Sequence, residues 1–509
     1  MKRIRNARSA RVGAALVGLG LLGAVAAWAS PGGSLEGRVQ EYRLANGLTV
    51  LALRRGIAPV VSLQMTFRVG GVDEPSGHTG MAHLLEHLLF KGTRTLGTRD
   101  WARERPLLEE IERVGRALDR ERRKGDRADP AEVARLREEL GRLQERHREL
   151  VVKDEIDAIY TRNGAVGFNA FTSSDLTSYI VSLPSDRLEL WARIESERMR
   201  DPVLREYYVE REVVIEERRQ RYGSDPDGRL YEALLSTAFV AHPYRDPVIG
   251  WPSDLETLDL GATREFFRRY YGPDNCVVVA VGDVDPPAFF RLVERYFGDL
   301  EPRGAPDDRP ITREPPQPGP RRAEVWFDAE PRLAVAFHKP TLPHRDDYVF
   351  DVIEAVLTDG RSSRLVRELV DRRRIAASVS AANGLPGARY PNLFAVFLTP
   401  LQGVAPEEAE RALLGELDRL GREPPTPEEL ERVLRRLEAD RVKSLLSNGG
   451  LARRLAYFQA VAGDWRYIEE HPKVLRTITP EEVAQVARRY FTPENRTVVV
   501  LRPGREGQP

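Results

Sequence analysis

A short pattern that occurs twice restricts the folds open to this 509-residue chain. Residues 268–275 read Arg-Arg-Tyr-Tyr-Gly-Pro-Asp-Asn, and residues 488–495 read Arg-Arg-Tyr-Phe-Thr-Pro-Glu-Asn. Each copy runs into a Val-rich segment, so each predicts the end of a helix, a turn and a buried strand. Chance could produce a short match of this kind, but the shared register favours an internal duplication. We therefore expect two related domains of mixed helix and strand.

The composition between the two copies indicates where the domains meet. Residues 302–320 are rich in Pro, Gly and Asp, as linkers are. We predict an N-terminal domain over residues 38–300, a linker over 301–320 and a non-catalytic C-terminal domain over 321–505. Two charged helical stretches, 101–123 and 130–152, predict a helical hairpin inserted at about residues 101–158. This hairpin is either a solvated structural element, which we favour, or a docking surface for a partner.

A five-residue motif, His83-Leu84-Leu85-Glu86-His87, suggests a metal site. On a helix, His83 and His87 project from one face about one turn apart, and two neutral imidazoles can share a metal ion. Glu86 lies on the same broad face, where it can act as a base toward a metal-activated water. The order is that of the inverted zincin motif. Taken alone, this match favours neither a metal site nor a purely structural helix. The flanking leucines favour metal, because unpaired polar groups on a buried helix cost several kcal/mol.

A second helical segment, residues 206–222, offers four carboxylates: Glu210, Glu212, Glu216 and Glu217. Helical spacing places Glu217 on a partly apolar face with Glu210 and Val213, which we predict to be buried. Glu212 and Glu216 share another face, which we predict to be in solvent. Glu210 and Glu217 are about 10 Å apart along the axis, so they cannot bind one ion, and Glu210 would instead orient a ligand.

Composition and the N-terminus narrow the classes of function. Lys plus Arg equals Asp plus Glu at 78 each, so no basic field indicates nucleic acid. The one cysteine, Cys276, can build neither an internal disulfide nor a Cys-rich zinc site. Basic residues, an apolar run and Ala27-Trp28-Ala29 predict a signal peptide over residues 1–29, the alternative being an uncleaved membrane anchor. Both place the rest of the chain outside the cytoplasm, in the periplasm or secreted.

Together these segments resemble the insulinase (M16) family of zinc metallopeptidases, and specifically its short two-domain branch, which includes mitochondrial processing peptidases. The resemblance rests on residues 83–87, 169–172, 210–217, 242–250, 271–283 and, more weakly, 360–365. It implies an α+β fold of two α/β roll domains, each an antiparallel-rich sheet flanked by helices. It also implies one zinc ion bound by His83, His87 and Glu217, with Glu86 as general base and Glu210 in support.

The resemblance further implies a function and partners. The activity would be that of a zinc endopeptidase acting on extended peptides, which would pair with a strand edge at Asn169, Ala170 and Phe171. The alternative is a non-catalytic structural or substrate-binding subunit, although inactive relatives lose the His and Glu set that is intact here. The interval from His87 to Glu217 is longer than is usual in the family, and the inserted hairpin accounts for it. Relatives often take an Arg/Tyr pair from an inactive half. No such pair is identifiable here, so we expect a homodimer or a heterodimer with a related chain.

Overall fold

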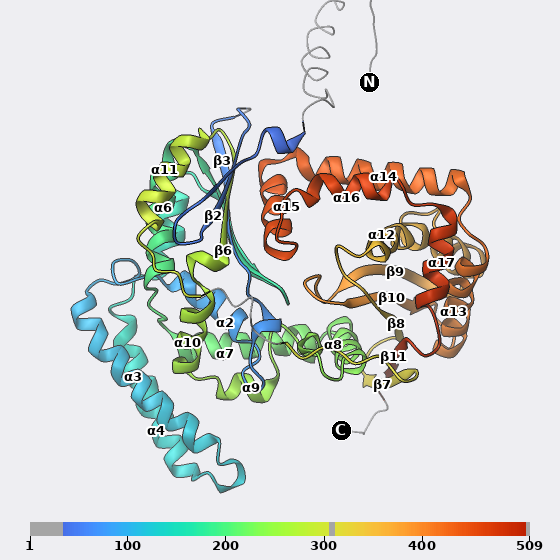
Figure 1. Ribbon diagram of the computed structural model, residues 1–509. Helices are drawn as coiled ribbons and strands as arrows, with labels where there is room; N and C mark the ends of the chain where they lie inside the picture. Colours follow the sequence, from blue (N-terminus) through green and yellow to red (C-terminus); the bar gives the residue numbers. More distant parts are fainter. Residues whose placement is uncertain (1–33, 57, 305–310, 505–509) are drawn as a thin grey trace, which may run out of the picture.

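Two β-sheets form the framework of the protein in the computed structural model, which describes residues 34–56, 58–304 and 311–504 (Figure 1). The predicted signal peptide lies outside the described residues. The first sheet has the strand order β1-β2-β6-β3-β5-β4. Its strands are β1 (Gln40–Arg43), β2 (Thr49–Arg54), β3 (Val60–Phe67), β4 (Val166–Thr172), β5 (Thr177–Pro184) and β6 (Cys276–Gly282). The second sheet has the order β7-β11-β8-β10-β9. Its strands are β7 (Arg321–Phe327), β8 (Arg332–Lys339), β9 (Ala376–Leu385), β10 (Asn392–Pro400) and β11 (Arg496–Pro503).

The two sheets share one topology once β1 is set aside. The outer pair in each, β2 with β6 and β7 with β11, is parallel, and the other neighbours are antiparallel. The duplicated sequence pattern leads into β6 in one half and β11 in the other, which occupy the same position in their sheets. The predicted fold class, two related domains with antiparallel-rich sheets, is confirmed.

Helices cover both sheets. The helices of the first half are α2 (Met81–Leu88), α3 (Trp101–Arg122), α4 (Pro130–Arg148), α5 (Glu155–Arg162), α6 (Leu188–Arg200), α7 (Tyr207–Arg218), α8 (Pro226–Ala238), α9 (Pro252–Thr257), α10 (Leu260–Tyr270) and α11 (Pro286–Phe297). Those of the second are α12 (Arg345–Thr358), α13 (Pro406–Arg422), α14 (Pro427–Leu446), α15 (Asn448–Val461), α16 (Tyr467–Leu475) and α17 (Pro480–Tyr490). Since both faces of the first sheet are covered, the central strand β6 is a continuous buried run of Cys, Val and Ala.

The two halves exchange one helix each. Helix α8 of the first half packs on the second sheet, where Leu230 and Leu234 contact a cluster that includes Val499. Helix α15 of the second half packs on the first sheet, where Leu455 joins a cluster with Val279. Figure 1 shows α15 beside β3 and β6, and α8 beside β8 and β11. Each sheet therefore has one face covered by its own half and the other face covered by its neighbour.

A buried polar contact also joins the halves. The Arg389 guanidinium pairs with Asp73 at 2.8 Å, and the backbone N–H of Arg389 donates to the carboxylate of Asp175. Tyr244 donates its hydroxyl to the other oxygen of Asp175. Both ends of the Arg389–Asp73 pair are almost fully buried, so the contact is isolated from competing water.

The inserted hairpin extends away from both sheets (Figure 1). Helices α3 and α4 pack on each other through buried leucines, among them Leu118, Leu136 and Leu140. In the described part of the chain, no helix combines the length and apolar character needed to cross a membrane.

Candidate metal centre

Helix α2 starts at a glycine that no other residue could replace without strain. Gly80 has φ of +88°, and a Cβ there would lie 2.5 Å from the carbonyl oxygen of Ile249. The buried carboxylate of Glu74 accepts hydrogen bonds from the N–H groups of Gly80 and Ala82, which satisfies donors that the first helical turn leaves free. Leu84 and Leu85 anchor the helix in the core. The motif residues are thus held on a rigid, buried element.

The two motif histidines converge on one carboxylate oxygen from another helix. His83 Nε2 lies 3.7 Å from Oε2 of Glu217 on α7, and His87 Nε2 lies 3.6 Å from the same atom. These separations are too long for good hydrogen bonds. They are close to the roughly 3.3 Å that separates two ligands on a tetrahedral ion with bonds of about 2.0 Å. Among the described residues, these three form the one group of His, Cys, Asp and Glu side chains close enough to share an ion.

The electrostatics of His83 suit a metal ligand. Burial, together with the charges of His87 and Arg221, lowers the pKa of His83 to about 3, so its ring is neutral near pH 7. Its Nδ1 is buried and makes no hydrogen bond to the described residues. A neutral imidazole lone pair on each ring and one carboxylate oxygen form the donor set that zinc prefers. The residues present therefore fit the metal that the motif suggests.

Glu86 stands beside this group without belonging to it. The hydroxyl of Thr172, the last residue of edge strand β4, donates to Glu86 Oε2 at 2.6 Å. Burial raises the pKa of Glu86, although the Thr172 hydrogen bond acts in the opposite direction. The sheet edge thus fixes the orientation of a half-buried carboxylate next to the three metal donors.

Glu210 contacts the far side of one ligand ring. Its Oε2 lies 3.2 Å from His87 Nδ1, and its Oε1 lies 2.6 Å from Lys91 Nζ. Burial opposes protonation of His87, but the hydrogen bond and charge of Glu210, with the charges of Glu217 and Glu86, raise the pKa of the ring overall. From this position Glu210 can orient the His87 ring.

One expectation about α7 is wrong. Val213 was expected to be buried on the face of Glu217, but it is 45% exposed, and Val209 one turn earlier is 39% exposed. Only part of that face, at Glu210 and Val214, meets the core. The reason is that α7 lies between the core and the inserted hairpin, so a stripe through Val209 and Val213 faces the gap between them. Glu212 and Glu216 are exposed, as expected.

The remaining candidates lie on β4, an edge strand of the first sheet. Asn169 is exposed there, Ala170 is buried and Phe171 is half-buried. Sequence reasoning assigned no role to Thr172, Lys91 or Arg221. Arg221 pairs with Oε1 of Glu217 at 2.8 Å. Lys91 follows His87 by four residues and Arg221 follows Glu217 by four, so helical spacing was a signal that could have identified both.

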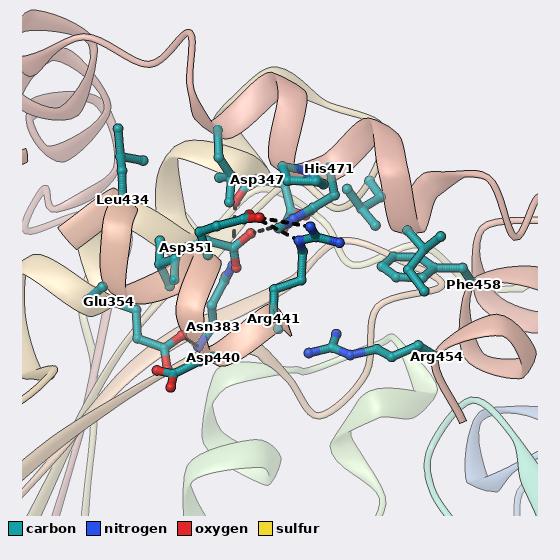
Figure 2. Close-up of a pocket in the computed structure, with 18 of the residues that line it drawn as sticks. Asp347, Asp351, Glu354, Asn383, Leu434, Asp440, Arg441, Arg454, Phe458 and His471 are labelled. Atoms are coloured by element: carbon teal, nitrogen blue, oxygen red, sulfur yellow. Dashed lines mark hydrogen bonds and ion pairs between the residues drawn. The ribbon is translucent and has the colours of Figure 1, made fainter. Parts of the chain in front are cut away.

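The second half holds a cavity at the equivalent position. Helix α12 lies between β8 and β9 in the chain as α2 lies between β3 and β4. Figure 2 shows the cavity of about 620 Å³ that it lines. Asp351 there is paired with His471 at 2.7 Å and accepts a hydrogen bond from Asn383. Oδ1 of Asn383 is buried without a hydrogen-bond partner among the described residues. The described residues there include no second set of metal donors.

Comparison with protein families gives matches in both halves. The family model described as "Insulinase (Peptidase family M16)" matches residues 49–119 and 152–250. The model described as "Peptidase M16 inactive domain" matches residues 257–437. The interval between the two matched stretches, residues 120–151, holds the end of α3 and all of α4, whereas most of α3 lies within the match.

Individual relatives agree along most of the chain. The zinc protease PqqE of Helicobacter pylori is 28% identical over 472 residues, covering 91% of this chain and 93% of the relative. An uncharacterized zinc protease of Streptomyces coelicolor is 25% identical over 465 residues, covering 89% and 87%. The crystal structure of a protease from Helicobacter pylori superposes with a TM-score of 0.75 at 26% identity, covering 92% of this chain and all of that one. The periplasmic protease PqqL of Escherichia coli shares the fold, with a TM-score of 0.66 at 17% identity over 91% of this chain and 47% of its own.

Proposed function

The chain belongs to the M16 family of peptidases, and we propose that it is a zinc-dependent endopeptidase that hydrolyses extended peptides or unfolded protein segments outside the cytoplasm. The observation that carries this proposal is the convergence of His83 and His87 on one oxygen of Glu217, with Glu86 held beside them by Thr172. The relatives named zinc proteases support the choice of metal.

Each residue of the site then has a role that follows from its contacts. His83, His87 and Glu217 would hold one zinc ion per chain, which when bound supplies Lewis acidity at the scissile carbonyl. Glu86 would take a proton from the attacking water and pass it to the leaving amine. Because Thr172 occupies Oε2, the proton would be carried on Oε1. Glu210 would orient His87, and Lys91 would hold Glu210 in place.

The substrate would add a strand to the first sheet. Asn169, Ala170 and Phe171 lie on edge strand β4, three residues or fewer before the Thr172 that contacts Glu86. A peptide paired along this edge would pass the metal donors in an extended conformation, the geometry of β-augmentation. Selection by main-chain pairing would favour unfolded segments over folded proteins.

We assign the catalytic domain to residues 38–300 and the non-catalytic domain to residues 321–505, joined by a linker over 301–320. The family model described as an inactive domain matches residues 257–437, which include much of the second domain and also residues 257–300 of the first. A homodimer or a heterodimer with a related chain, and export by the N-terminal segment, complete the proposal. The alternative, a non-catalytic subunit, is disfavoured by the complete set of His83, Glu86, His87 and Glu217.

Substitution of the proposed base tests the function. We expect Glu86→Gln to keep its zinc, measured by atomic emission, and to lose at least 100-fold in cleavage of unfolded casein. Glu138→Gln, a matched change of an exposed carboxylate on α4 outside the candidate site, should retain activity. Undiminished turnover by Glu86→Gln would contradict the role of the base. A zinc-loaded wild-type protein that cleaves no unfolded substrate would favour the non-catalytic alternative.

A further inference from the structure

The inserted hairpin and α7 enclose a groove of about 860 Å³. Its walls include Leu118 and Arg122 of α3, Arg137 and Leu140 of α4, and Val209 and Val213 of α7. Glu217 also lines the groove, so the groove reaches one of the three residues of the candidate metal centre.

An exposed apolar stripe leads along this groove from the metal donors. Val209, Val213 and Glu217 are spaced by four residues, so they lie on one face of α7. The stripe extends about 12 Å from Glu217 along the helix axis. At about 3.4 Å per residue, that length accommodates three to four residues of an extended peptide. Both valines are more than one-third exposed, so their burial is available to stabilise a bound chain.

Two arginines on the opposite wall are without partners in the described part of the chain. Arg113, Arg116, Arg135 and Arg142 of the same hairpin form ion pairs with nearby glutamates. Other hairpin arginines have no side-chain partner among the described residues, namely Arg103, Arg120, Arg127 and Arg146. No ion pair or hydrogen bond is formed by the side chains of Arg122 and Arg137 among the described residues. Glu212, across the groove, is likewise unpaired among these residues, and the charged residues that line the groove, three arginines and three glutamates, balance. A free guanidinium is well suited to bind a carboxylate.

We propose that this groove binds a segment of the peptide substrate flanking the scissile bond, with aliphatic side chains on Val209 and Val213 and an acidic side chain at Arg137. The inference rests on the proposed function and adds a substrate preference to it. A protein partner is a poorer fit. Leu118 and Leu140 are already buried by the hairpin itself, and two exposed valines are far less surface than the roughly 1,000 Å² that a specific protein interface buries.

Peptide binding to the full-length, zinc-loaded Glu86→Gln protein tests the groove without requiring turnover. The probes are a fluorescein-labelled hexa-alanine amide, the same peptide extended at its amino end by Asp-Gly-Leu-Ala-Val-Gly or at its carboxyl end by Gly-Val-Ala-Leu-Gly-Asp, also as the amide, and versions of both extended peptides with Asn in place of Asp. We expect one of the two extensions to bind at least five-fold more tightly than hexa-alanine by fluorescence anisotropy. In the Glu86→Gln background, Arg137→Gln should remove about a five-fold advantage of the Asp version over the Asn version and leave hexa-alanine unchanged.

Two matched variants separate the groove from general effects. Val209→Thr combined with Val213→Thr keeps the side-chain shape and should weaken both the Asp and Asn versions of the preferred extension. Arg142 lies on α4, as Arg137 does, but outside the groove, so Arg142→Gln should leave the affinity for every peptide unchanged. Equal binding of hexa-alanine and both extensions, or an Arg137→Gln variant that still prefers Asp, would overturn the inference. Cleavage of casein by the otherwise wild-type protein independently tests the proposed function.

Discussion

The Nδ1 atom of His87 lies 3.2 Å from Oε2 of Glu210, while Nε2 of the same ring faces Glu217. This contact assigns the ring proton to Nδ1 and leaves the Nε2 lone pair free for a metal. We expect Glu210→Ala to weaken zinc binding about 10-fold to 100-fold, the usual effect of removing such a partner. Competition with a chromophoric chelator measures the change. Glu212→Ala, two residues away and exposed, is the control, and an equal loss in both variants would contradict the orienting role.

Glu217 and Glu216 provide a sharper comparison, because they are neighbours that point in different directions. Glu217 faces the two imidazoles, whereas Glu216 is exposed and pairs with Arg219. We expect Glu217→Gln to lower the zinc content of the purified protein to well below one ion per chain, since an amide is a poorer zinc ligand than a carboxylate. Glu216→Gln should retain its zinc. Metal analysis after gel filtration checks both, and loss of zinc from both would show that α7 is oriented differently.

The base of the hairpin contains a buried charge whose effect depends on pH. Glu104 is fully buried and pairs with Arg205 at 2.6 Å and His147 at 2.8 Å. Burial disfavours its ionised form, but hydrogen bonds from His147, Arg205 and Thr98 lower its pKa from 4.5 to about 2. A lowered folded-state pKa stabilises the fold fully above about pH 4.5, and this contribution of roughly 3 kcal/mol is lost as the pH falls toward 2.

We therefore expect Glu104→Gln to unfold at a lower temperature than wild type at pH 6, and the difference between the two to shrink at pH 3. Circular dichroism melts of both proteins in the presence of a chelator remove any contribution of bound metal. A difference that stays constant between the two pH values would contradict the predicted linkage.

Because α8 packs on the second sheet, we expect a destabilising substitution in this helix of the first half to destabilise the second half. Leu234 is fully buried against the second sheet, so Leu234→Ala should cost about 2–5 kcal/mol. Hydrogen exchange should then accelerate in β8 and β11, which belong to the second half. Leu255→Ala, a matched truncation in the main core of the first half, should accelerate exchange in the first sheet instead. The opposite pattern would contradict the packing of α8.

The sequence carried enough information to predict the fold class and to nominate the donor set. Strong local signals account for this: the Leu-rich helix around His83 and His87 and the duplicated pattern before β6 and β11 are both short-range. The spacing of Glu210 from Glu217 was likewise sufficient to exclude shared coordination. The structure then shows Glu210 in contact with a ligand ring rather than with the donor group itself.

Features that depend on distant contacts could not be predicted in this way. The apolar face of α8 looks like that of any amphipathic helix, and nothing local indicates that it packs on the second sheet rather than the first. The pair of Asp73 and Arg389 joins residues that are 316 positions apart in the chain. Val213 was misassigned because helical periodicity reports which residues share a face, and not whether a neighbouring element covers that face.

The reciprocal positions of α8 and α15 also bear on how the chain can be divided. Cleavage of the chain between the halves would not produce two independently stable fragments. Each fragment would retain a helix that packs on the other fragment's sheet, and one face of its own sheet would be exposed. The two fragments should therefore remain associated after cleavage, and either fragment expressed alone should be prone to aggregate. A single-domain ancestor would achieve the same packing as a homodimer in which the two copies exchange the helix equivalent to α8 and α15.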